Sequence, residues 1–160
     1  MDTYVTTILI ATVIDVGLSA GLFATFSYAV MTGLRRTDDR TFVSAMQQLN
    51  VGIINGWFAL IFVGSLVLMV VSAILHLGAG RPALPWILGG LAAYLTVLVI
   101  TFVVNVPLNN RLAAEGDPAD AAAARQRFEP GWVRWNAVRT LGSVAAFACL
   151  VIALVVHARI

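Results

Sequence analysis

The chain has 160 residues, of which 60% are hydrophobic and only 11% are charged, with a formal net charge of +2. No soluble domain of this size needs so much apolar surface, and so small a net charge says little about partners. The short alternating segments of a transmembrane β-barrel do not occur in the sequence, which leaves a helical membrane protein.

Four apolar runs reach the roughly 20 residues that a helix needs to cross a bilayer. They cover residues 4–31, 51–77, 84–106 and 136–156. The sequence therefore predicts an all-α, polytopic membrane protein, in which residues 1–160 form a single domain of four transmembrane helices packed as a bundle.

The basic residues predict how this bundle is oriented. All ten are arginines, and this usage, with abundant Ala, Val and Leu, is typical of a GC-rich bacterial genome. Most of them lie in the connections after the first and third spans, which share one side of a four-span protein. The positive-inside rule then predicts that loops 32–44 and 109–135 are cytoplasmic and that both termini are outside. Only Arg81 and Arg159 lie on the outer side.

The first span contains Asp15, the only acidic residue within the four runs. An ionisable group at membrane depth is costly unless it is neutral or hydrogen-bonded. A structural hydrogen bond to a neighbouring helix and a proton-handling role are both compatible with this position.

A helix start precedes the second span, where Thr37 offers a capping hydroxyl and Asp38 and Asp39 place acids in the first turn. We expect this helix to continue into the second span. Its membrane entry carries four amides within nine residues, which indicates a polar lining, although amides that bridge helices are an alternative. These amides are Gln47, Gln48, Asn50 and Asn55.

His76 ends the second span and His157 ends the fourth, both toward the outer side. Together with Asp15 they offer three metal-ligating side chains. Asp15, however, lies about 15 Å along its helix from the outer end at the usual helical rise, so we predict no metal site from these three residues. A metal bound by histidines of two subunits is an open alternative.

The end of the third span combines amides with a proline. Pro107 removes a backbone donor and clashes with the preceding turn, so the helix should kink and leave carbonyls near Val103 open. A stripe of residues at helical spacing lies on one face of this helix, and we interpret it as one wall of a polar pocket. The stripe consists of Tyr94, Leu98, Thr101, Asn105 and Asn109, with Asn110 beside the last of them.

The next connection predicts a short amphipathic, Ala-rich helix. Asp117, Pro118 and Asp120 give a cap, a first-turn proline and an acid at the third helical position. We expect this helix to lie on the cytoplasmic face and to end before Pro130.

The fourth span begins with a second polar face. Tryptophans at this depth are typical of an aromatic belt, and an arginine there is typical of snorkelling toward headgroups. An amide and an arginine on the tryptophan face would instead point at the bundle, where Arg139 supplies a fixed cation suited to a phenolate, an enolate or a carboxylate. The face consists of Trp132, Trp135, Asn136, Arg139 and Ser143. Because this face, the stripe and the four amides lie at one depth, we predict one pocket at the cytoplasmic membrane face.

Four segments resemble the DUF1772, or anthrone oxygenase, family. They are FVSAMQQLN at 42–50, NGWF at 55–58, TFVVNVPLNN at 101–110 and WVRWNAVRT at 132–140. The family often has proline where this chain has Thr32 and Gly56. The resemblance implies a small four-helix membrane protein, and the fungal relatives oxidise an anthrone to an anthraquinone with molecular oxygen.

From this resemblance we expect O2-dependent oxidation of a flat phenolic or polyketide-type substrate, with Trp132 and Trp135 flanking its rings. Arg139 is the expected oxyanion stabiliser, assisted as catalytic residues by the amides of Asn105, Asn109 and Asn136. Further substrate contacts are expected from Gln47, Gln48, Asn50, Asn55, Thr101 and Tyr94, and Asp15 is the proton-handling candidate. The sequence has no haem-attachment motif, dinucleotide fingerprint or histidine cluster, so we expect no tightly bound cofactor, with O2 as the co-substrate.

The expected partners are membrane lipid and a hydrophobic aromatic small molecule, with no nucleic acid, and a homo-oligomer is an open alternative. Two other functions stay open. One is a non-catalytic small membrane subunit or a protein that binds lipid or another hydrophobic ligand, in which the polar cluster serves helix packing. The other is a transporter-like protein with Asp15 as its proton site, which four spans without an evident internal repeat disfavour.

Overall fold

A computed structural model of the protein describes residues 3–77 and 82–159. Within these ranges every element is helical, as the composition predicts. The elements are α1 (Thr3–Thr25), the π-helical turn η1 (Phe26–Val30), α2 (Met31–Leu34), α3 (Asp39–Gly52), α4 (Gly56–Leu75), α5 (Leu84–Ile100), the π-helical turn η2 (Thr101–Asn105), α6 (Val106–Ala114) and α7 (Ala121–His157). Arg81, which was assigned to the outer side, lies outside the described residues.

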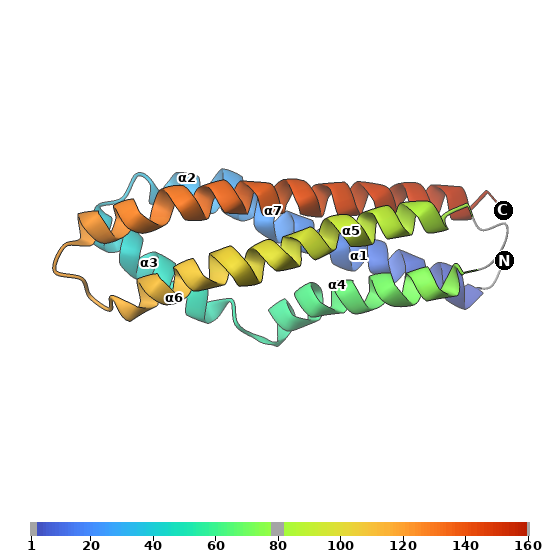
Figure 1. Ribbon diagram of the computed structural model, residues 1–160, viewed down its shortest axis with the longest axis horizontal. Coiled ribbons are helices and arrows are strands. Elements are labelled where there is room, and N and C mark those ends of the chain that lie inside the picture. Colours follow the sequence, from blue (N-terminus) through green and yellow to red (C-terminus); the bar gives the residue numbers. More distant parts are fainter. Residues whose placement is uncertain (1–2, 78–81, 160) are drawn as a thin grey trace.

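Four helical segments are long and apolar enough to cross a membrane. They run over Thr3–Leu34, Gly56–Leu75, Leu84–Ala114 and Ala121–His157, with mean hydropathies from 1.9 to 2.8. The predicted all-α bundle of four spans is confirmed, and the chain is a multi-pass membrane protein. Both termini lie at one end of the elongated bundle, called here the termini end, while α2, α3 and the connection from α6 to α7 lie at the other, the loop end (Figure 1).

The four spans form a ring in which α1 and α5 each contact both α4 and α7. Buried residues such as Val16, Met69 and Leu150 fill its centre. Gly142 lets α7 approach α5 closely, because a Cβ at this glycine would lie only 2.9 Å from Val97 Cγ2. This contact holds the last turns of α5 against the part of α7 that carries the polar face.

A second hydrophobic cluster closes the loop end and packs α3 and α6 against the first half of α7. Its buried residues include Phe42, Met46, Leu112, Phe128 and Trp132. Glu129 accepts hydrogen bonds from Arg35 Nε at 2.8 Å and from Arg125 Nε at 2.7 Å. Arg125 also donates to Asp39 at 3.0 Å. The Arg125–Asp39 pair links α7 to the start of α3, and the Arg35–Glu129 pair links α7 to the end of α2.

The helix that leads into the second span is interrupted, which corrects the prediction of a continuous helix. α3 ends at Gly52, and α4 begins at Gly56 after the N-cap Asn55, whose side chain accepts from Phe58 N at 3.0 Å. Asn55 also donates to the Gly52 carbonyl at 2.8 Å. A capping amide between two glycines favours a break, because it bonds backbone groups that a continuous helix would pair internally.

The start of α3 differs from the prediction by one residue. Asp38, rather than Thr37, is the N-cap, and it accepts from the Thr41 hydroxyl at 2.6 Å and from Thr41 N at 3.0 Å. These hydrogen bonds to the charged form hold the pKa of Asp38 below its ordinary value. The Thr37 hydroxyl donates to the Leu34 carbonyl at 2.7 Å instead.

A single helix runs from Ala121 to His157, so the separate short helix predicted before the fourth span is in fact the first part of that span. Asp120 caps it, accepting from Ala123 N at 2.9 Å. Pro130 lies inside α7 and does not end it. Although proline removes one helical hydrogen bond, Phe128 and Trp132 on either side are buried in the loop-end cluster and hold both halves in one helix.

Candidate functional site

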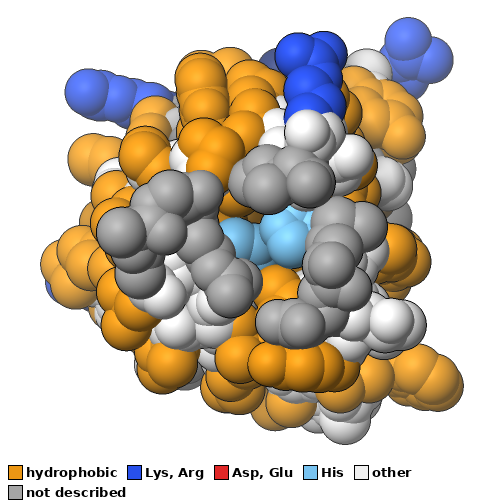
Figure 2. Space-filling view, turned by 90° about the vertical axis from the view of Figure 1, so that its right-hand side faces the viewer, with side chains coloured by type: hydrophobic (Ala, Val, Ile, Leu, Met, Phe, Trp, Pro, Cys, Tyr) orange, Lys and Arg blue, Asp and Glu red, His pale blue; other side chains and the backbone are white. Residues whose placement is uncertain are grey.

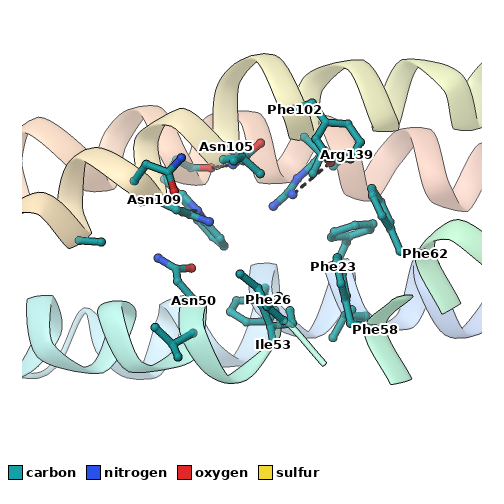
Figure 3. A pocket seen from close by; sticks show the side chains of 18 of the residues that line it. Phe23, Phe26, Asn50, Ile53, Phe58, Phe62, Phe102, Asn105, Asn109 and Arg139 are labelled. Carbon is teal, nitrogen blue, oxygen red and sulfur yellow. Dashed lines mark hydrogen bonds between the residues drawn. The ribbon is translucent and has the colours of Figure 1, made fainter. Parts of the chain in front are cut away.

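A cavity of about 350 Å³ lies between the two hydrophobic clusters, because Phe62 of the central core and Trp132 of the loop-end cluster both line it. Residues of all four spans and of α3 form its walls. The polar lining residues are Gln47, Asn50, Thr101, Asn105, Asn109, Asn110 and Arg139. Side chains from three stretches far apart in the sequence therefore face one space (Figure 3).

The third span changes its helical pitch where it meets the cavity. Thr101–Asn105 form the π-helical turn η2, and Pro107 follows in the first turn of α6. A proline cannot donate to the carbonyl one turn before it, and the widened turn bonds Val106 N to the Thr101 carbonyl. The predicted disturbance before Pro107 is therefore a π turn, and it places the buried side chains of Thr101 and Asn105 in the cavity wall.

Arg139 lines the cavity and is only 6% exposed. Its Nη2 donates to Asn136 Oδ1 at 2.8 Å and its Nη1 to Thr101 Oγ1 at 3.3 Å, and its Cζ lies 4.6 Å from the centroid of the Phe23 ring. Its Nε has no partner, and among the described residues no carboxylate pairs with the guanidinium. A buried cation without a counter-ion is costly, and an anion bound in the cavity would offset that cost.

Two amides of the lining also have unpaired atoms. Asn105 is buried, and its Nδ2 donates to the Trp132 carbonyl at 3.5 Å, while its Oδ1 has no partner. Asn50 Nδ2 is likewise buried without a partner, whereas Asn109 Oδ1 accepts from Trp132 Nε1 at 2.8 Å. Three of the four buried unpartnered side-chain atoms in the described ranges thus belong to residues that line this cavity. Because buried polar groups are normally hydrogen-bonded, the pattern indicates a site for a polar ligand group.

Phenylalanines form the part of the lining that the sequence analysis missed. Phe23, Phe58, Phe62 and Phe102 lie on the side of the cavity away from Asn50 and Asn109 (Figure 3). The rings of Phe58 and Phe62 are stacked, with centroids 5.0 Å apart and planes inclined by 14°. Their i, i+4 spacing was the available signal, since it places both rings on one helix face. Together with Trp132 these rings form walls that suit a flat aromatic ligand.

Two predicted residues of the fourth span do not line the cavity. Asn136 is buried and reaches the cavity only through its hydrogen bond to Arg139. Trp135 is half-buried beside Arg134, whose Cζ lies 5.8 Å from its ring centroid. Trp132, Asn136 and Arg139 follow a four-three spacing that stays on one face, while Trp135 is turned by about 100° from Asn136 because an α-helix has 3.6 residues per turn.

Three other predicted lining residues lie elsewhere. Tyr94 is two turns before Thr101 in the third span, and its hydroxyl donates to the Phe62 carbonyl at 2.9 Å inside the central core. Gln48 lines a shallow apolar groove outside the cavity, and Asn55 is the exposed cap of α4. The predicted wall of four amides is therefore reduced to Gln47 and Asn50, because the break after α3 turns Asn55 away.

Asp15 and the two histidines also lie outside the cavity. Ser65 donates to Asp15 Oδ2 at 3.0 Å, so the acid bridges α1 and α4. His76 Nε2 lies 3.2 Å from His157 Nδ1, and Thr6 Oγ1 lies 3.0 Å from His157 Nε2. The histidine side chains are at the centre of the termini end (Figure 2). Across residues 3–77 and 82–159, no group of three or more His, Cys, Asp or Glu side chains could hold a metal ion.

The fold and the cavity define the class of protein: a multi-pass helical membrane protein whose spans enclose a cavity with a buried, unpaired cation. A model of the anthrone oxygenase family matches residues 57–149, more than half of the 160 residues. The chain therefore belongs to the anthrone oxygenase family. The matched range contains η2 and the part of α7 with Arg139, while α3 precedes it. No curated protein and no solved structure matches the chain.

Proposed function

We propose that this protein oxidises a flat phenolic or polyketide-type substrate with molecular oxygen, as the name of its family describes. The observation that carries the proposal is Arg139, a buried residue of the cavity wall whose Nε has no hydrogen-bond partner and whose guanidinium has no carboxylate counter-ion among the described residues. Such a cation in a water-poor site favours the anionic form of a bound phenol or enol.

The proposed reaction begins with loss of a proton from the substrate, which leaves an enolate. The ring carbon that lost the proton forms a bond with O2, and the resulting peroxide anion takes up one proton to become a hydroperoxide. The same carbon then loses its second hydrogen as a proton while the O–O bond breaks, so that a carbonyl forms and the departing hydroxide leaves with that proton as water. For an anthrone, one substrate molecule and one O2 give one anthraquinone and one water. The substrate itself supplies the electrons, so the proposal includes no tightly bound cofactor.

The cavity residues have separate roles in this reaction. Arg139 binds the oxyanion, and Asn105 Oδ1 accepts a hydrogen bond from a hydroxyl group of the substrate. Asn136 is a positioning residue that holds the guanidinium through its 2.8 Å hydrogen bond. Trp132 and the phenylalanines contact the rings, and Asn109 orients Trp132 through its Nε1. Asp15 is hydrogen-bonded in the interface of α1 and α4 and has no role in this scheme.

We also propose that the loop end faces the cytoplasm. The basic residues of this end exceed those at the termini end, and arginines close to membrane spans are retained on the cytoplasmic side. The cavity would then open at the inner leaflet. Protease protection of tags placed in the loop between α6 and α7 and at a terminus tests this orientation.

The experiment that tests the function measures oxygen consumption by detergent-purified protein given anthrone. We expect uptake above the spontaneous rate, with stoichiometric anthraquinone, and loss of that uptake in Arg139→Ala. Arg134→Ala is the matched control, since Arg134 is an exposed arginine of the same helix that does not line the cavity. Metal content and elution profile are measured on each sample. Uptake equal to the spontaneous rate, from correctly folded protein, would contradict the proposal.

A protein that binds a hydrophobic ligand without catalysis is the second candidate. The unpaired atoms of Arg139, Asn105 and Asn50 favour it equally, because they require a ligand and not a reaction. In that case anthrone would bind in an Arg139-dependent manner, and oxygen uptake would stay at the spontaneous rate.

A further inference from the structure

The exposed lining residues of the cavity, which form its mouth, are mainly apolar, with Asn110 as an exposed polar residue, whereas polar side chains lie among its buried lining residues. Val51, Ile54, Val63 and Phe102 line the cavity and are also 68%, 79%, 52% and 61% exposed. They come from the end of α3, the link to α4, α4 itself and η2. The interior residues Thr101, Asn105 and Arg139 are at most 6% exposed.

An apolar rim around buried polar side chains is the reverse of the arrangement in a site that opens to water. Exposed rim residues of aqueous sites are usually polar, while large exposed apolar patches mark surfaces that meet apolar surroundings. In a protein that spans a membrane, those surroundings are lipid chains. Trp57 supports a position of the mouth close to the membrane interface. It is 75% exposed in the first turn of α4, next to the link from α3, and exposed tryptophans are typical of membrane interfaces.

We propose that the cavity opens sideways to the bilayer, between the link from α3 to α4 and the π turn η2, and that it takes its ligand from the membrane. The ligand class is a membrane-dissolved aromatic compound with an acidic oxygen, whose rings pass the apolar mouth and whose oxygen reaches Arg139. The identity of the ligand rests on the proposed function, whereas the sideways opening does not.

The opening can be tested by fluorescence quenching without any turnover. Trp132 lines the cavity and is only 3% exposed, so it contacts lipid chains only if they enter through the mouth. The protein is prepared with Trp57, Trp86 and Trp135 replaced by Phe and is placed in discs of lipid brominated on the acyl chains. We expect these discs to quench Trp132 relative to discs of ordinary lipid, and to quench it more than aqueous acrylamide does.

A matched pair of variants shows whether the mouth is the route. Val63→Phe narrows the mouth, while Val67→Phe makes the same change on the same helix at a residue that is 53% exposed and does not line the cavity. We expect Val63→Phe to reduce bromolipid quenching at least about twofold and Val67→Phe to leave it unchanged, because added bulk matters only where space is limited. Equal quenching in the two variants, or quenching by acrylamide alone, would overturn the sideways opening.

Adding anthrone under argon tests the ligand class. We expect anthrone to shrink the difference between brominated and ordinary discs in the parent protein, and to do so less in Arg139→Ala. An unchanged difference would show that the mouth admits lipid chains but not this class of ligand, which would overturn that part of the proposal. Failure of the oxygen assay alone would count against the proposed function and leave the sideways opening standing.

Discussion

Thr12 and Tyr94, in the middle of the bundle, use their hydroxyl groups to bond neighbouring helices, whereas Arg139 and Asn105, at the cavity, keep unpaired atoms beside the hydrogen bonds that they make. In the middle, Thr12 Oγ1 lies 2.8 Å from Ser72 Oγ, and Tyr94 donates to the Phe62 carbonyl at 2.9 Å. Around the cavity, Arg139 Nε and Asn105 Oδ1 are buried without partners. In the amino-acid sequence alone, both regions consist of polar residues within apolar runs and cannot be told apart. The difference indicates that the first region joins helices, and it supports our proposal that the second binds a ligand.

The largest expected effect comes from removing the unpaired cation. Arg139→Met should lower kcat/KM for anthrone oxidation about 100-fold or more, as does the loss of one oxyanion donor in other enzymes. Thermal unfolding in detergent should show equal or higher stability, because removing the cost of burying an unpaired charge offsets the lost hydrogen bonds to Asn136 and Thr101. A folded protein that keeps its activity, or a marked loss of stability, would place Arg139 in the same category as the central polar residues.

The next effect concerns the unpaired acceptor in the cavity. Asn105→Leu should lower kcat/KM about tenfold, which corresponds to roughly 1.4 kcal/mol and to one hydrogen bond. The measurement is steady-state oxygen uptake at several anthrone concentrations. Ser143→Ala is the control, because Ser143 Oγ is also buried and unpartnered but does not line the cavity. If both variants lost activity equally, an unpaired atom would not by itself mark a ligand contact.

The central region should show the opposite behaviour. Tyr94→Phe removes the hydroxyl that donates to the Phe62 carbonyl and lies 3.2 Å from Ser19 Oγ, which should cost about 1–3 kcal/mol of stability. Activity per folded molecule should stay the same, because Tyr94 does not line the cavity. Thermal unfolding and oxygen uptake on the same sample test both parts. Lost activity at unchanged stability would return Tyr94 to the substrate contacts that the sequence predicts.

The smallest effect is expected at Asp15. Asp15→Asn keeps an oxygen that can accept a hydrogen bond from Ser65, so the unfolding temperature should change little. The rate of oxygen uptake should stay within about twofold of that of the parent protein. A large loss of oxygen uptake in the folded variant would instead support the proton-handling role. Proton flux in liposomes that disappears in Asp15→Asn would support the transporter-like alternative.

Much of the site follows from residue spacing, and the errors have local physical causes. The spacing of Trp132, Asn136 and Arg139 predicts one buried face, and all three are buried. The i+3 spacing from Trp132 also predicts Trp135 on that face, but Trp135 lies about 100° around the helix from Asn136 and does not line the cavity. The prediction that Asn55 lines the pocket depends on a continuous helix from residue 39 into the second span. In the structure Asn55 caps α4, so the helix is interrupted before it and the Asn55 side chain does not line the cavity.

The sequence by itself determined the class of protein, the number of spans and the depth of the site. Run length and hydropathy decide whether a helix crosses a membrane, and these are properties of the local chain. Only the tertiary structure decided which polar atoms stay unpaired and which phenylalanines face the cavity. Whether Arg139 finds a counter-ion depends on side chains from other helices, and helical spacing within one segment cannot specify those neighbours.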